Sequence, residues 1–528
     1  MNRLNRVVFM GAFLVLAGVS VQARVNVAAA EMIGRYFDLL SDNNLAVAGD
    51  MWVPEAIERA NRFGINYTGI PLRVDAISPI IRYLALKQTQ PILPIRDFKT
   101  LPGNTWVKME YSEIYGAQLL SHYYYARQIG DWYWLDYPQD YYGADWPVTE
   151  SRYLRIHAHP DVQRFLNPAV LNEVDAFIEA MADTLRIPAD RLELIRDKKI
   201  EYFYCQNDSS VRDITGFLSK GQLDLASNDI ISSVFPHFHE LTHLLVNIRL
   251  QNVPLFTLPL LREGMAVRFG GRASKEAPML LDLATYLGRE GLVALDSLLT
   301  MKGFDSEATA EIVYPESGLF TAYLLDKIGM DRYFDLYLRL SGQYDEVQAL
   351  TTDTTKAAIL AATGVKNWDK LLAEFVKFSD KRLDHDQGLM PGPLKKGKTV
   401  FTDDRVTIAT DKNWVSFHLV YDTTMRAPSG CLMFDRDSIL VDHESALFDA
   451  HYGPIEQFEG YRYGLRFDSH EAGLYDYASN ELIAKYIWGI TPSDQYLDTT
   501  AHTVSLCVRR SLMHDHLPAE GDYNFLPW

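Results

Sequence analysis

The sequence predicts a multidomain α+β protein, and three observations support this fold class. The 528 residues are 48% hydrophobic and 23% charged, which is ordinary for globular chains and sufficient for two to four domains. Helical and strand-like patterns follow one another through most of the chain, and short alternating runs replace them near the end. We therefore expect four segments: a leader at 1–23, an N-terminal α+β domain at 24–150, a central domain at 151–390 and a C-terminal β-rich domain at 398–528.

The leader has the order of a secretory signal peptide. Arg3 and Arg6 give a basic start, an apolar run follows from Val7 to Val19, and Val21-Gln-Ala23 offers a small-residue cleavage site. The run is too short for a comfortable membrane span, and no later stretch offers about 18 uninterrupted apolar residues. The sequence predicts export to the periplasm or the medium, with no stable membrane insertion and a mature chain that starts near Arg24.

The N-terminal segment begins with helical patterning and ends with strand-like patterning. The expected helices and strands are Ala30–Leu40, Pro54–Phe63, Thr105–Ile114 and Ala117–Tyr137. This order is similar to the nuclear-transport-factor-2-like cone fold, and the similarity is carried by Tyr36-Phe-Asp-Leu-Leu, Trp52-Val-Pro-Glu-Ala-Ile-Glu-Arg-Ala60 and Gly130-Asp-Trp-Tyr-Trp-Leu135. The aromatic residues from Tyr123 to Trp146 fit a packed hairpin core better than a stacking surface for sugars or peptides.

Strand-like and helical patterns alternate from residue 151 to about 235. They fall at Tyr153–His157, Ala169–Leu185, Lys199–Gln206 and Phe217–Ile231. An edge strand in such a βαβ-like region can bind an extended peptide through main-chain hydrogen bonds, and Phe217–Leu225 is our candidate for it.

His239, Glu240 and His243 follow as an H-E-x-x-H motif in a stretch where a helix is expected. Residues four apart share one face of a helix, so both imidazoles can point at one Zn²⁺. Glu240, one position along, can then act as general base toward the attacking water. His237, two residues before His239, is interpreted as structural or as part of the surface of the first turn.

Glu263 supplies a third candidate ligand, twenty positions beyond His243. Gly264 and Ala266 have small side chains that we expect to let this helix pack closely against the histidine helix. Two imidazoles and one carboxylate favour Zn²⁺ over magnesium or calcium.

The paired motifs His239-Glu-Leu-Thr-His243 and Glu263-Gly-Met-Ala266 resemble the gluzincin clan of zinc metallopeptidases, over roughly residues 151 to 390. The other common pattern, H-E-x-x-H-x-x-G-x-x-H, is excluded because Val246 and Arg249 stand where it needs Gly and His. The resemblance implies zinc held by His239, His243 and Glu263, with Glu240 as the general base.

Tyr314 is the residue to which the resemblance assigns the hydrogen bond to the reaction intermediate. The clan's aminopeptidases usually read Tyr-x-x-Gly, whereas this chain has one extra residue between Tyr314 and Gly318. Glu316, beside Tyr314, is interpreted as a loop or helix-start carboxylate stabilised by the helix dipole.

Two further departures from the clan bear on the site. Thermolysin-like enzymes place an Asp four residues after the glutamate ligand to orient a histidine, but Val267 stands there, with Asn247 as a possible substitute. The aminopeptidase strand G-x-M-E-N has only a weak echo in Gly221-Gln-Leu-Asp-Leu225. Aminopeptidase specificity is therefore not supported.

The chain is expected to be mostly helical from Glu263 to about Leu383, and Thr351–Phe375 is similar to the clan's closing helices. A turn-rich linker, Pro391–Gly397, precedes the β-rich segment. Its expected strands include Arg405–Ala409, Val415–Val420 and His502–Val508. The histidines of this segment have no zinc spacing, so we assign it no chemistry.

Charge and cysteine content exclude several classes of function. The formal net charge of −18 makes the chain a poor binder of nucleic acid or anionic membranes, and loss of Arg3 and Arg6 makes it more negative still. Cys431 and Cys507 could pair after export, leaving Cys205, but three buried thiols fit equally well. Without a C-x-x-C there is no cysteine zinc site.

The sequence thus predicts an exported zinc metallopeptidase that acts on a peptide or protein substrate. Two alternatives stay open. One is the same zinc chemistry acting on a bond other than a peptide bond, and the other is an exported scaffold in which zinc is structural.

Overall fold

Helices and strands both run through the chain in the computed structural model, which describes residues 27–383 and the strands within 389–527. The gaps within the first range are 77, 79–80, 82–94, 103–104, 116–117, 273–274, 276, 290, 292 and 307–309, and longer gaps separate the strands of the second range. The predicted leader lies outside the described residues. Mixed α+β structure with several separate sheets confirms the predicted α+β class, while the individual predicted domains stay predictions.

The described residues divide into two compact units. One contains the residues up to Pro236 together with Leu244–Leu255, and the other contains His237–His243 and the chain from Phe256 onward. The first unit therefore continues across residue 150, where a domain boundary was predicted.

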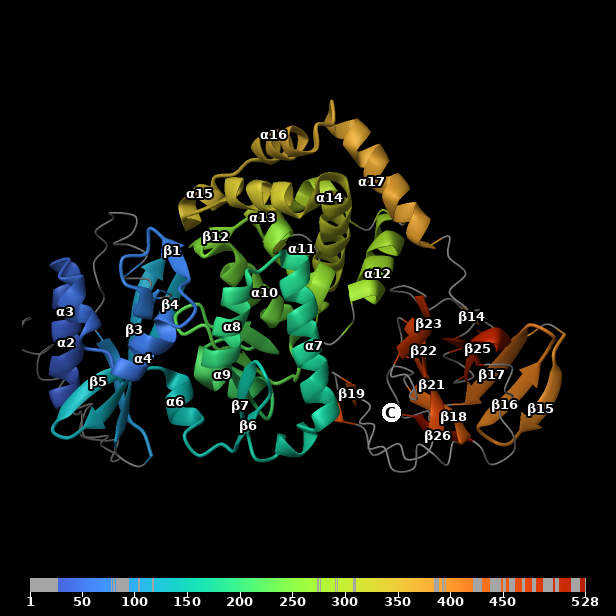
Figure 1. Ribbon diagram of the computed structural model, residues 1–528, viewed down its shortest axis with the longest axis horizontal. Coiled ribbons are helices and arrows are strands. Elements are labelled where there is room, and N and C mark those ends of the chain that lie inside the picture. Colours follow the sequence, from blue (N-terminus) through green and yellow to red (C-terminus); the bar gives the residue numbers. More distant parts are fainter. Residues whose placement is uncertain are drawn as a thin grey trace, which may run out of the picture. The chain divides into compact units, whose positions relative to one another are not determined.

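The first unit begins with three helices and a four-stranded antiparallel sheet (Figure 1). In chain order these are α2 (Val27–Ser41), α3 (Leu45–Gly49), α4 (Pro54–Asn61), β2 (Ile95–Thr100), β3 (Trp106–Tyr115), β4 (Gln118–Ile129) and β5 (Trp132–Asp136). Ile33, Tyr36 and Leu40 recur at helical spacing on α2 and are buried in one core with Tyr124 of β4. The predicted helices and strands are confirmed, while the cone-like fold stays a prediction.

The aromatic residues of this region are divided between core and surface. Trp52, Tyr36 and Tyr124 pack edge to face in the core, with ring centroids 5.8–6.4 Å apart. Tyr123 and Trp132 instead remain 40% and 73% exposed. The packed-core interpretation therefore holds for the residues that face the helices.

A five-stranded sheet follows, in the order β6-β7-β8-β10-β9. The strands are β6 (Val148–Glu150), β7 (Leu154–Ala158), β8 (Ile200–Tyr204), β9 (Gly221–Leu223) and β10 (Ile230–Ser232), and the helices between them are α7 (Pro168–Leu185), α8 (Ala189–Lys198) and α9 (Asp208–Thr215). All five residues of β8 are buried, as the central strand of a sheet flanked by helices requires. The predicted edge strand is confirmed as β9, which pairs antiparallel with β10 alone.

The turn between β9 and β10 is held by cations from the N-terminal helices. Asp229, fully buried, accepts hydrogen bonds from Arg62 at 2.8 Å and Arg59 at 3.3 Å. Gln139 adds a third hydrogen bond at 2.8 Å, and Arg73 donates to the main-chain carbonyl of Leu225 at 2.6 Å. These interactions join the N-terminal helical segments to the turn between β9 and β10.

The second unit contains the first turn of α10 (Phe238–Leu250) and a set of helices that follow it. They are α11 (Pro259–Gly270), α12 (Ala277–Arg289), α13 (Met301–Ser306), α14 (Ala310–Arg339), α15 (Tyr344–Gln348), α16 (Thr352–Thr363) and α17 (Trp368–Leu383). The predicted helical run to Leu383 is confirmed. A positive φ of 74° at Gly329 interrupts α14, which is therefore two helices joined at a kink.

Glycines set the close contacts of α11. A Cβ added to Gly264 would lie 2.3 Å from Thr321 Oγ1 and 2.5 Å from the Ser317 carbonyl oxygen, both on α14. The expectation that Gly264 faces the histidine helix is therefore wrong. Gly270 makes that approach instead, because its added Cβ would lie 2.3 Å from the carbonyl oxygen of Phe238 at the start of α10.

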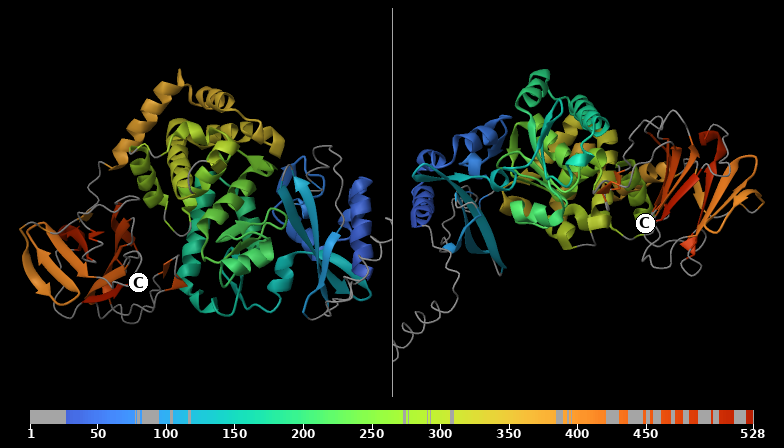
Figure 2. Two further views of the ribbon diagram at one scale, coloured as in Figure 1. Left: turned by 180° about the vertical axis from the view of Figure 1, so that it is seen from behind. Right: turned by 90° about the horizontal axis from the view of Figure 1, so that it is seen from below.

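The C-terminal region is a sandwich of two antiparallel sheets, coloured orange and red in Figure 2. One sheet has the order β14 (Leu389–Pro391), β25 (Thr503–Arg509), β17 (Trp414–Val420), β16 (Val406–Thr410) and β15 (Lys398–Thr402), with β24 (Leu497–Asp498) also pairing β25. The other has the order β23 (Glu481–Ile487), β22 (Glu471–Asp476), β21 (Tyr461–Phe467), β18 (Gly430–Arg436) and β26 (Tyr523–Pro527). Phe417 and Phe434, from opposite sheets, meet in the buried core, with ring centroids 5.1 Å apart.

The described cysteine side chains are buried. Cys205 is a free thiol and is fully buried, and Cys507 is fully buried as well. The pairing of Cys431 with Cys507 stays a prediction, because the side chain of Cys431 lies outside the described residues. None of the described helices combines the length and the apolar composition of a bilayer span.

Candidate metal centre

The two histidines of the motif lie one turn apart on α10. Their ring centroids are 4.8 Å apart and the rings are nearly perpendicular. His239 is buried and His243 is half-buried, so the imidazoles sit below the protein surface. The i, i+4 spacing predicted from the sequence does place them on one face of the helix.

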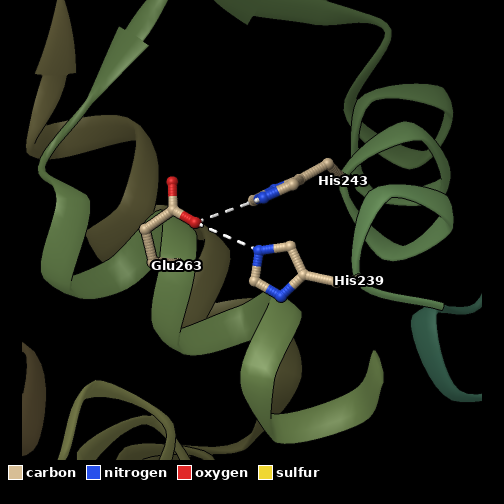
Figure 3. Close-up of side chains that lie close together, drawn as sticks. All are labelled: His239, His243 and Glu263. Atoms are coloured by element: carbon tan, nitrogen blue, oxygen red, sulfur yellow. Dashed lines mark hydrogen bonds and ion pairs between the residues drawn. The ribbon is translucent and has the colours of Figure 1, made fainter. Parts of the chain in front are cut away.

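Glu263 comes from α11 and meets both histidines (Figure 3). Its Oε2 lies 3.2 Å from His239 Nε2 and 3.4 Å from His243 Nε2. All three ligand atoms lie within 4.8 Å of one another. Among the described residues, this is the one group of His, Cys, Asp and Glu side chains close enough to hold a metal ion.

The spacing of these atoms fits a small metal ion. A tetrahedral ion with ligand bonds of about 2.0–2.1 Å separates its ligand atoms by about 3.3 Å. The 3.2 and 3.4 Å between Oε2 and the two imidazole nitrogens agree with that edge, and the third pair of ligand atoms, the two nitrogens, lies within 4.8 Å. Two nitrogens and one oxygen are the donor set of catalytic zinc sites with an open position.

The carboxylate of Glu263 is buried yet ionised. Burial by itself would raise the pKa of Glu263, but the guanidinium of Arg262, with smaller effects from His243 and His239, holds that pKa well below its usual range. Arg262 Nε and Nη2 both lie 2.8 Å from Glu263 Oε1. Oε2 is left for the histidines.

The main chain of Gly271 orients His239. His239 Nδ1 lies 2.8 Å from the Gly271 carbonyl oxygen, so Nδ1–H donates to that oxygen and Nε2 is directed at Glu263. Asn247 was the residue suggested for orienting a histidine in place of the missing Asp, but Asn247 Nδ2 donates to Tyr67 Oη at 3.4 Å instead. The Gly270-Gly271 pair at the end of α11 was the available signal for a close main-chain approach.

Glu240 and His237 complete the polar surroundings of the histidines. Burial would raise the pKa of Glu240, but the imidazoles of His243, His237 and His239 hold it below its usual value, so the carboxylate is ionised at neutral pH. His237 is buried, which corrects the surface alternative, and burial lowers its pKa to about 4. A neutral imidazole therefore stands beside the motif.

Tyr314, on α14, is brought to the same place. Its ring centroid lies 6.1 Å from that of His239, and the guanidinium carbon of Arg272 lies 4.1 Å above its ring. Burial and the nearby Glu263 carboxylate raise the pKa of Tyr314, so its phenol remains protonated and can donate a hydrogen bond. Sequence reasoning did not identify Arg272.

Glu316 differs from its predicted place at a loop or helix start. It lies inside α14, is 3% exposed, and its Oε2 has no hydrogen-bond partner among the described residues. Burial raises its pKa to about 8, so the side chain is mostly a neutral acid at pH 7.

We expect Glu316→Gln to flatten the pH dependence of stability. The pKa of the parent carboxyl is raised by folding, from an ordinary 4.5 to about 8, so the unfolded chain ionises first. The contribution of the protonated Glu316 side chain to the stability of the fold is complete below pH 4.5 and is lost as pH rises to about 8. Between pH 4.5 and about 8, the melting temperature of the parent should fall further than that of Glu316→Gln, by on the order of 5 °C.

Exposed Glu193→Gln is the control and should keep the parent profile. The same dependence of melting temperature on pH in all three proteins would mean that Glu316 is ionised in the folded state.

Comparisons with protein-family models, curated proteins and solved structures found no match to this chain, so the interpretation of the centre rests on its own chemistry and geometry.

Proposed function

We propose that this protein is a zinc-dependent hydrolase that cleaves peptide bonds outside the cytoplasm. The observation that carries the proposal is the convergence of His239, His243 and Glu263 within 4.8 Å, from two helices, with Glu240 next to the first histidine. The arrangement and the sequence spacing of these residues both resemble those of the gluzincin clan, and on that ground we propose that the chain belongs to this clan. Export is proposed from the predicted leader at 1–23.

His239 Nε2, His243 Nε2 and Glu263 Oε2 are the atoms that would hold Zn²⁺. The ion would supply a Lewis acid that polarises the substrate carbonyl and lowers the pKa of a water molecule toward neutrality. Three protein ligands leave one position open for this chemistry, whereas a structural zinc site normally uses four.

Glu240 moves the protons in this proposal. Its ionised carboxylate accepts a proton from the attacking water and then returns it to the leaving nitrogen, acting first as general base and then as general acid. Because the imidazoles hold the pKa of Glu240 below its usual value, its carboxylate is ionised and can accept this proton.

Tyr314 stabilises negative charge on the substrate oxygen. Its protonated phenol donates a hydrogen bond that strengthens as the carbonyl oxygen becomes an oxyanion. The Arg272 guanidinium, stacked over the ring, holds the phenol and adds positive charge.

Tyr314→Phe should therefore lower the rate of hydrolysis by on the order of 10-fold to 10³-fold with zinc content unchanged, because one oxyanion donor is removed and no ligand is touched. Steady-state kinetics on a cleaved peptide, with zinc measured in the same samples, checks this. Phe304→Leu, which alters a ring 5.6 Å from Tyr314 but removes no hydroxyl, is the control. An equal loss in both variants would assign the effect to packing.

A digest of a diverse peptide library by the mature protein tests the proposed function. The protein is assayed as isolated, after removal of metal by a chelator, and after return of one equivalent of Zn²⁺. We expect about one zinc per chain and cleavage that is lost and regained with the metal. Stable zinc without any peptide cleavage would favour the scaffold, or action on another bond, and failure to bind zinc would refute the proposal.

A further inference from the structure

The two oxygens of Glu263 have different partners. Oε2 faces His239 and His243, at 3.2 and 3.4 Å. Oε1 accepts a hydrogen bond from Arg262 Nε at 2.8 Å and forms an ion pair with Arg262 Nη2, also at 2.8 Å. The Glu263 side chain is only 7% exposed, so water does not compete for either oxygen to any extent.

The pairing with Arg262 is not what helix geometry favours by default. Neighbouring residues on a helix point in different directions, and side chains three or four apart are the ones that normally meet. The Arg262 side chain is 40% exposed and could extend into water. It instead turns toward Glu263 and places two nitrogens of its planar guanidinium 2.8 Å from a single oxygen.

We infer that Arg262 is a positioning residue that confines Glu263 to one metal-facing oxygen; this rests on the proposed metal function. With Oε1 held by a charge-assisted hydrogen bond and an ion pair from Arg262, the carboxylate cannot rotate to offer both oxygens to an ion beside the histidines. The fourth position of the site then stays free for water and substrate.

A second consequence concerns the strength of the ligand. The Arg262 guanidinium draws negative charge toward Oε1, so Oε2 is a weaker donor than a free carboxylate oxygen. A metal ion bound there keeps more of its Lewis acidity. Outer partners of metal ligands usually contribute 10-fold to 100-fold to affinity or activity.

Cobalt substitution reads the coordination number directly. The visible bands of Co²⁺ are intense in four-coordinate sites and much weaker at higher coordination. We expect intense bands in the Co²⁺-loaded parent and a marked loss of intensity in Arg262→Gln, because the released carboxylate binds through both oxygens. Hydrolysis by the zinc form of that variant should fall by about 10-fold to 100-fold.

Two further variants serve as controls for the role of Arg262. Arg268→Gln removes an arginine of the same helix that stacks on Phe269, and it should leave both spectrum and rate unchanged. Arg262→Lys keeps the charge but not the fork, and it should give an intermediate spectrum even if Arg262→Gln folds poorly.

The outcomes separate this inference from the proposed function. Spectra of Arg262→Gln and Arg262→Lys that match an active parent would overturn the role of Arg262 and leave the hydrolase proposal intact. A parent that binds no Co²⁺ would overturn both.

Discussion

Hydrolysis should fall by at least about 10²-fold in Glu240→Gln, while the metal content stays that of the parent. The amide keeps the shape of the side chain but cannot accept a proton at neutral pH. His239, His243 and Glu263 are untouched, so the three ligand atoms remain within 4.8 Å of one another. The expected signature is therefore a fall in kcat without loss of zinc.

The measurement is steady-state cleavage of a peptide found in the library digest, with zinc determined in the same samples. Glu193→Gln, an exposed change on α8, provides the control and should retain the parent rate. A Glu240→Gln variant that cleaves as fast as the parent at equal zinc content would rule out Glu240 as the general base.

Gly264→Ala should cause a large loss of stability, because the added methyl group would overlap α14. The added Cβ would lie 2.3 Å from Thr321 Oγ1 and 2.5 Å from the main-chain oxygen of Ser317, and a backbone atom cannot move aside cheaply. Overpacking of this kind typically lowers the free energy of unfolding by about 1–3 kcal/mol. Because Glu263 is the preceding residue, a shift of α11 should also weaken metal binding.

Thermal melting of the metal-free protein and a zinc titration measure the two effects separately. Gly288→Ala on α12 is the matched control, since the nearest atom to its added Cβ is Glu316 Oε2 at 4.0 Å. We expect that variant to be neutral or slightly more stable. Equal melting of the two variants would mean that α11 and α14 are not in close contact at Gly264.

The sequence sufficed for features that depend on local spacing. His239 and His243 needed only a helix, and the strands of the C-terminal region were visible because apolar residues alternate in them. One local feature was missed although its signals were present. Helix α9 is capped by Asn207, which accepts a hydrogen bond from Ser210 N, and ends at Gly216 with φ 83°.

Features that depend on distant packing could not be predicted from spacing. Gly264 was rightly identified as a close-contact residue, but nothing local tells which helix it touches. The sequence shows that Glu316 has an ionisable side chain, but only the packing of α14 shows that this side chain is buried. The role of the Gly271 carbonyl could be anticipated only in part, because the Gly270-Gly271 pair signals a close main-chain approach but does not show which side chain the carbonyl meets.

The buried cations around Asp229 have a consequence for how this protein can have evolved. Asp229 and Arg62 are 167 positions apart, yet the Asp229 side chain is fully buried and the Arg62 side chain is only 5% exposed. A chain that lost its first 150 residues would keep Asp229 and lose Arg59 and Arg62, and breaking a buried ion pair typically costs about 3–5 kcal/mol. Recombination near residue 150 would therefore separate the oppositely charged partners of buried ion pairs. We expect the two segments to be inherited together and not exchanged as independent modules.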